Sequence, residues 1–97
     1  PVGDTTGSHI EDGEVVTPEG FKEAYAAYAE AGWGAVPFEP AYGGGGFPWV
    51  VGIAMQEMLN SANMALAMAP LLTQAAIDAI AFHGTEEQRE VYMKKMV

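Results

Sequence analysis

The spacing of apolar residues predicts helices through most of the chain after residue 17. Thr17 is a favourable N-cap, Pro18 suits a first helical turn, and Gly32 suits the position just past a helix end. We therefore expect the first helix to run from Pro18 to Ala31. The apolar positions that recur there every three or four residues are Phe21, Ala24, Tyr25 and Tyr28.

A second run of helical spacing opens at Pro48, another proline suited to a first turn. Its apolar face comprises Val51, Ala54, Met55, Met58 and Ala62. The following stretch, Ser61 to Gly84, is rich in alanine and apolar on most sides, which is typical of a helix with several neighbours. Pro70 lacks a backbone N–H, so we expect it to kink or restart this helix, and Gly84 to end it.

A short last helix is predicted after Gly84. Residues 85–88 read TEEQ, a capping box in which Thr85 accepts a hydrogen bond from the backbone N–H of Gln88 and the Gln88 side chain reaches back. The side chains expected to face inward from this helix are Val91, Tyr92 and Met96.

The remaining segments are rich in residues that break regular structure. Residues 1–16 combine glycines with acidic residues and show no period, so we expect an extended lead-in arm before a helical domain at residues 17–97. Residues 32–48 contain three prolines and six glycines and should form a connection. No strand alternation of useful length occurs. The predicted class is all-α, a small orthogonal bundle of four to five short helices.

Composition narrows the classes of partner. The 97 residues suffice for one small domain. A formal net charge of -9 disfavours nucleic acid and anionic membrane surfaces, because only Lys22, Arg89, Lys94 and Lys95 are cationic. No uninterrupted apolar run approaches the ~18 residues of a membrane span, so we expect no membrane insertion.

The lack of cysteine fits a cytoplasmic location. The start lacks methionine and leader features, which indicates a fragment.

Four consecutive glycines, Gly43 to Gly46, raise the possibility of a phosphate-binding loop. No lysine follows them, no convincing strand precedes them, and Pro48 removes one N–H that could meet an anion. A structural turn, based on the access of glycine to positive φ, is the favoured interpretation.

The two histidines give no clear site. His83 lies at the end of an alanine-rich helix, where a protonated imidazole would complement the helix dipole. His9 lies beside Glu11 and Asp12, but the segment lacks the oxygen-ligand spacing of a calcium loop. We assign no catalytic, cofactor-binding or metal-binding residue.

The methionine-rich helices are more informative. Methionine fills irregular gaps in cores, and it also lines adaptable apolar pockets. One face recurs at spacings of three and four with small members that leave room beside it, which would suit an acyl chain. This candidate substrate pocket comprises Met64, Ala67, Met68, Leu71 and Ala75.

Three stretches together resemble the N-terminal helical domain of the acyl-CoA dehydrogenase family. They are GWGAVPFEPAYGGGG, QEMLNSANMALA and AIAFHGTEEQREVYMKKMV, and the similarity covers about Phe21 to Val97. Their order makes the resemblance specific. The preceding GDTTGSHIEDGEVVTPEGF is similar to the longer members that act on 3-methylthiopropanoyl-CoA and related short acyl thioesters.

The resemblance implies an FAD-dependent enzyme that removes the α proton of an acyl-CoA with a glutamate and passes the β hydride to the flavin. It also implies an acceptor of the electron-transfer flavoprotein type. The flavin motif and the catalytic glutamate of the family lie beyond this chain, so we expect the chain alone to be inactive, with Glu57 structural. Its implied role is one wall of the acyl pocket.

The rival hypothesis is a stand-alone helical interaction module whose apolar face binds a partner. In either case, helices that expose apolar faces should associate, and we expect a homo-oligomer. Coding sequence beyond Val97 would distinguish the enzyme from the module.

Overall fold

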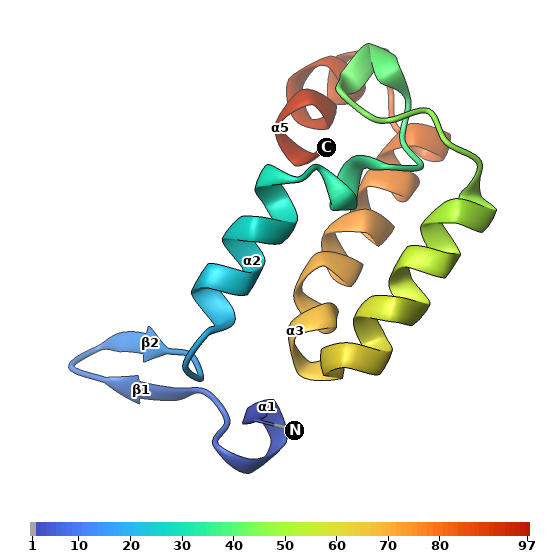
Figure 1. The fold of residues 1–97 in the computed structure, drawn as a ribbon. Coiled ribbons are helices and arrows are strands. Elements are labelled where there is room, and N and C mark those ends of the chain that lie inside the picture. Colours follow the sequence, from blue (N-terminus) through green and yellow to red (C-terminus); the bar gives the residue numbers. More distant parts are fainter. Residues whose placement is uncertain (1) are drawn as a thin grey trace.

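The computed structural model describes residues 2–97 and is built mainly from helices (Figure 1). The predicted all-α class is confirmed, with one small sheet added. The elements in chain order are α1 (Val2–Thr5), β1 (His9–Glu11), β2 (Glu14–Val16), α2 (Phe21–Glu30), η1 (Trp33–Ala35), η2 (Pro40–Tyr42), α3 (Trp49–His83), α4 (Glu86–Gln88), η3 (Arg89–Met93) and α5 (Lys94–Met96).

The N-terminal segment is more ordered than an extended arm. β1 and β2 pair in antiparallel fashion, with His9 opposite Val16 and Glu11 opposite Glu14. Asp12 and Gly13 form the turn with φ values of 51° and 81°. Positive φ at both positions is typical of the tightest hairpin turns, and an Asp-Gly pair is their usual sequence. The Asp-Gly pair is therefore a hairpin signal in the sequence, although the flanking residues lack the apolar alternation that predicts strands.

Helix α2 begins later than predicted. Its first residue is Phe21, and the residue at the N-cap position is Gly20, with φ of 84° and no side-chain hydrogen bond. The predicted start at Thr17 and Pro18 is therefore wrong. The Pro18 carbonyl instead accepts a turn hydrogen bond from the N–H of Phe21 at 3.2 Å. The predicted stop at Gly32 is confirmed: the helix ends at Glu30, one residue before the predicted Ala31, and Gly32 follows the C-cap Ala31 with a left-handed φ of 74°.

Helix α3 bends sharply at Asn63, where φ is -160° and ψ is 93°. Residues 49–62 form a first arm and residues 64–83 a second arm, and Figure 1 shows the two arms running in opposite directions beside each other. The break predicted at Pro70 is thus misplaced, since Pro70 lies inside the second arm. Gly84 ends the helix as predicted, and Pro48 directly precedes Trp49 rather than opening the helix.

The C-terminal turns close the small core. The capping box is present, with Gln88 N–H donating to Thr85 Oγ1 at 3.2 Å and Thr85 N–H donating to Gln88 Oε1 at 2.9 Å. Because Arg89–Met93 forms a π-helical turn, the inward position falls on Met93, which is 1% exposed. Val91 and Tyr92, predicted to face inward, are exposed. Met96 packs against the core as predicted.

The core joins three segments that are distant in sequence. Phe38 comes from the connection before α3, Ile77 from the second arm and Met93 from η3, and all three are buried. Phe38 also meets the Trp49 ring edge to face, with ring centroids 5.5 Å apart and planes at 89°. This core fixes the second arm of α3 at its C-terminal end.

Candidate functional site on helix α3

The predicted substrate-pocket residues separate into two groups. Met64 and Met68 are 64% and 57% exposed, Leu71 is 41% exposed, and Ala75 is also exposed. Ala67 differs, because it is only 4% exposed and faces the interior. We call Met64, Met68, Leu71 and Ala75 the outer face of the second arm.

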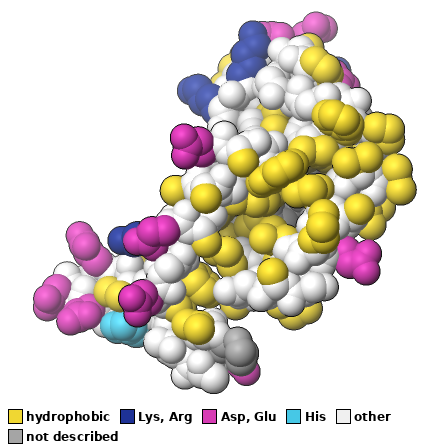
Figure 2. Space-filling model, in the orientation of Figure 1, with side chains coloured by type: hydrophobic (Ala, Val, Ile, Leu, Met, Phe, Trp, Pro, Cys, Tyr) yellow, Lys and Arg dark blue, Asp and Glu magenta, His cyan; other side chains and the backbone are white. Residues whose placement is uncertain are grey.

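Further large apolar side chains of α3 are exposed. Leu72 and Phe82, on the same arm, are 71% and 74% exposed. Val50 and Ile53, on the first arm, are exposed to a similar degree. Figure 2 shows hydrophobic side chains gathered on one part of the visible face, around a hollow, whereas acidic side chains gather over the N-terminal hairpin. Contiguous apolar surface of this kind marks a binding or packing surface.

Behind the outer face lies a polar contact between the arms. Gln74 is 7% exposed, and its Oε1 accepts a hydrogen bond from Gln56 Nε2 at 2.5 Å. Its own Nε2 donates to the backbone oxygen of Gly34 at 3.0 Å. Asn60 Nδ2 in turn donates to the carbonyl oxygen of Gln56 at 2.8 Å. These bonds connect both arms of α3 with η1.

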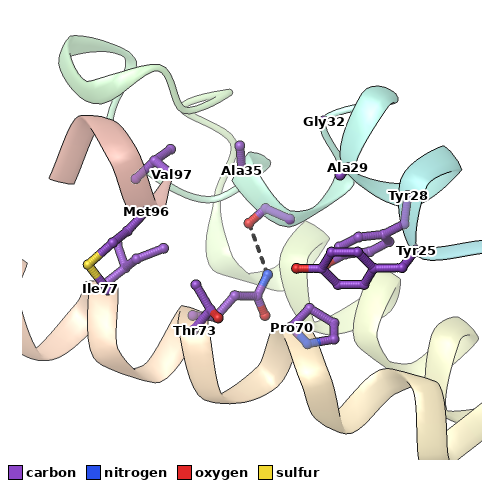
Figure 3. Close-up of a pocket in the computed structure, with 12 residues that line it drawn as sticks. Tyr25, Tyr28, Ala29, Gly32, Ala35, Pro70, Thr73, Ile77, Met96 and Val97 are labelled. Carbon is purple, nitrogen blue, oxygen red and sulfur yellow. Dashed lines mark hydrogen bonds between the residues drawn. The ribbon is translucent and has the colours of Figure 1, made fainter. Parts of the chain in front are cut away.

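A cavity of about 170 Å³ lies between α2, η1 and the second arm (Figure 3). The Tyr25 and Tyr28 rings approach each other within it, with centroids 6.2 Å apart. Burial raises the pKa of the Tyr28 hydroxyl above its ordinary value, and the neighbouring Tyr25 raises it further. Thr73 and Pro70 line the same cavity, so its wall mixes hydroxyl groups with apolar carbon.

Sequence reasoning missed a second, more apolar groove of about 320 Å³. It lies between α2 and the second arm of α3. The aromatic face of α2 was visible in the sequence, but which part of α3 it meets was not. The lining residues are Thr17, Phe21, Lys22, Tyr25, Ala26, Leu66 and Ala69.

The glycine cluster forms a turn. The backbone N–H groups of all four glycines donate hydrogen bonds inside the connection, at 2.9 to 3.0 Å. Their acceptors, in order from Gly43 to Gly46, are the carbonyl oxygens of Pro40, Glu39, Ala35 and Phe38. Since these donors are already bonded, they do not form an anion cradle. Gly43 and Gly46 also adopt positive φ, which explains the residue type.

Other candidate chemistry in residues 2–97 is sparse. His9 Nε2 lies 3.4 Å from Glu11 Oε2, and both side chains are exposed. No group of three metal-ligating side chains occurs among the described residues. Burial raises the pKa of Asp78, but this carboxyl group lines none of the cavities above and is not a candidate base. His83 is exposed at the end of α3.

By length and composition alone, α3 could cross a membrane. The bend at Asn63 divides it into two opposed arms, which a partly buried hydrogen bond between Gln56 and Gln74 connects. The absence of membrane insertion stays a prediction.

Comparison with known proteins places the chain. A model of the acyl-CoA dehydrogenase N-terminal domain matches residues 8–97. The chain is 43% identical to 3-methylmercaptopropionyl-CoA dehydrogenase of Ruegeria pomeroyi over 96 residues, which cover 99% of this chain and 16% of the relative. It is 39% identical to a broad-specificity linear acyl-CoA dehydrogenase of Mycobacterium tuberculosis, over 78% of this chain and 12% of the relative.

A butyryl-CoA dehydrogenase of Syntrophomonas wolfei is 35% identical over 84% of this chain and 13% of the relative. The chain thus spans 16% or less of the length of these curated relatives. Because the domain model covers nearly the whole sequence and the Ruegeria relative aligns along almost all of it, the chain belongs to the acyl-CoA dehydrogenase family, as its N-terminal domain.

Proposed function

We propose that this chain is the N-terminal domain of an FAD-dependent enzyme that oxidises an acyl-CoA thioester between its α and β carbons. The observation that carries the proposal is the family match along residues 8–97. The name of the Ruegeria relative favours short acyl thioesters with a methylthio group as substrates. An acceptor of the electron-transfer flavoprotein type and a homo-oligomeric enzyme belong to the same proposal.

Within that enzyme, the outer face of the second arm forms one wall of the acyl pocket. Four observations of exposure support this role, because Met64, Met68, Leu71 and Ala75 are apolar and open to solvent. Exposed apolar side chains are expected where this domain supplies one wall of a pocket and other parts of the enzyme supply the opposite wall. Ala67, buried behind the face, would act by packing rather than by contact with substrate.

FAD and the catalytic base are assigned to other parts of the enzyme. The glycine cluster does not fit the phosphates of the cofactor, because its four amides are bonded within their own connection. FAD would supply the acceptor for the hydride that leaves the β carbon. The part of this domain is to hold the acyl chain and exclude water from it.

Two measurements test the proposal. Titration of the purified 97-residue chain with FAD should give no stoichiometric flavin complex, and a yellow one-to-one complex would contradict it. A chimera, in which residues 2–97 replace the matched stretch of the Ruegeria relative, should retain dehydrogenase activity and bound FAD. A folded, flavin-loaded chimera without activity towards any acyl-CoA would also overturn the proposal.

A further inference from the structure

Gln74 is the buried polar side chain of α3, and it lies on the side of the second arm opposite solvent. Both polar atoms of its amide form hydrogen bonds. The oxygen accepts from Gln56, and the nitrogen donates to the Gly34 carbonyl. The bond to Gly34 is drawn as a dashed line in Figure 3. The partners lie 18 and 40 residues away in sequence. One side chain thus connects the second arm to two separate segments.

Gln74 is one of the residues that line the cavity of about 170 Å³ in Figure 3, and the other lining residues are mainly apolar or aromatic. A Cβ placed on Gly34 would lie 3.2 to 3.3 Å from the Tyr28 ring and hydroxyl, so that tyrosine closes the site against η1. Breaking either bond would leave a buried polar group without a partner, which is costly in such a place. The two hydrogen bonds of the Gln74 side chain therefore favour one rotation of the second arm about its axis.

Apolar contacts alone do not fix the rotation of the second arm about its axis. The second arm carries alanine and apolar side chains around most of its circumference, so a rotated arm would still bury apolar surface. Rotation by one residue, about 100°, would exchange the side chains of the outer face for their neighbours. Leu71 and Ala75 lie three residues before and one residue after Gln74, so a fixed amide fixes their direction.

We propose that Gln74 is a positioning residue which, held by Gln56 and Gly34, fixes the rotation of the second arm and hence which side chains face the acyl chain. This inference rests on the proposed function. Gln74 does not touch the substrate and acts through Leu71 and Ala75. Its effect should therefore appear in the preference between acyl chains, in addition to any effect on stability.

The test uses the chimera described above and the series of straight-chain acyl-CoA substrates from butyryl to dodecanoyl. The measured quantity is the ratio of kcat/KM between the short and long members. Gln74→Met keeps the side-chain length and removes both hydrogen bonds, and it should change this ratio on the order of tenfold. Gln56→Met should shift the ratio in the same direction by less. The double variant should not exceed Gln74→Met alone, because Gln56 acts through Gln74.

Two controls separate the possible failures. Ile77→Val loosens the core on the same arm but keeps the amide bonds, and it should leave the ratio unchanged. Ala75→Phe places bulk on the outer face and should shift the ratio if that face contacts substrate. A shift with Ala75→Phe but none with Gln74→Met overturns this inference alone. No shift with either variant overturns the proposed wall and this inference with it.

Equal shifts with Gln74→Met and Ile77→Val would reduce Gln74 to an ordinary core residue and contradict the proposal. If Gln74→Met does not fold, Gln56→Met carries the test, because it leaves the bond to Gly34 in place. An unchanged ratio in folded Gln56→Met then overturns the inference.

Discussion

Asn63 Oδ1 accepts a hydrogen bond from the backbone N–H of Leu66 at 3.1 Å. With its extended backbone angles, Asn63 is thus the N-cap of the second arm of α3. Asn63→Ala should lower the free energy of unfolding by about 1 kcal/mol, the typical loss of such a cap. Urea denaturation measures the change. Asn63→Asp keeps the acceptor, and Ser61→Ala alters an exposed neighbour, so both variants should have the same free energy of unfolding as the parent. An Asn63→Ala variant as stable as the parent would contradict the capping role.

The two alanines of the predicted pocket should respond differently to enlargement. Ala75→Phe in the chimera should discriminate against longer acyl chains, with a change on the order of tenfold or more in specificity. Ala67→Phe should instead overpack the interior and cost about 1 to 3 kcal/mol of stability. Chain-length profiles and denaturation curves of both variants provide the measurements. A reversed pattern, with Ala67→Phe altering specificity at unchanged stability, would place Ala67 in the pocket.

Tyr28 should make stability fall at alkaline pH. Burial, with a further contribution from Tyr25, raises the pKa of the folded tyrosine above 10.0. Above the ordinary pKa the unfolded chain loses this proton first, so it binds fewer protons than the folded chain and the free energy of unfolding decreases as pH rises towards the raised pKa. Tyr28→Phe should reduce this slope in denaturation experiments from pH 9 upward, whereas the exposed Tyr92→Phe should keep it. Identical slopes in both variants would exclude the effect.

The 97-residue chain should self-associate. Large apolar side chains such as Val50, Leu72 and Phe82 are each more than 70% exposed. The net charge of -9 opposes association, but the Debye length of ~8 Å in physiological salt screens most of that repulsion. Sedimentation velocity at micromolar concentration should therefore show dimers or larger species. A paired Leu72→Ser and Phe82→Ser variant should move towards monomer. A strictly monomeric parent would instead favour the independent module.

Local signals were predictable from the sequence, and contacts between distant residues were not. The capping box of Thr85 and Gln88 and the stop at Gly32 depend on a few adjacent residues, and both were predicted. Helix propensity predicts the break at Pro70, but the bend lies at Asn63, whose side chain caps the second arm as a proline cannot. The π-helical turn moved the inward position from Tyr92 to Met93, which a regular helical period does not anticipate.

The candidate site shows the same division. The spacing from Met64 to Ala75 predicts a shared face, but it does not say which edge of that face turns inward. The pattern therefore groups the buried Ala67 with exposed neighbours. The role of Gln74 was invisible in the sequence because its partners are supplied by tertiary packing. Whether the outer face lines an acyl pocket stays a prediction.

The connection around Gly43 to Gly46 has the composition of a flexible linker, yet each glycine amide is bonded to a carbonyl within the connection. In hydrogen-exchange experiments these amide protons should exchange slowly, at rates closer to those of the helices than to those of an open loop. Motion between α2 and the first arm of α3 would first have to break these bonds. The segment should therefore behave as a rigid connection between α2 and α3, and any hinge of the domain should lie elsewhere.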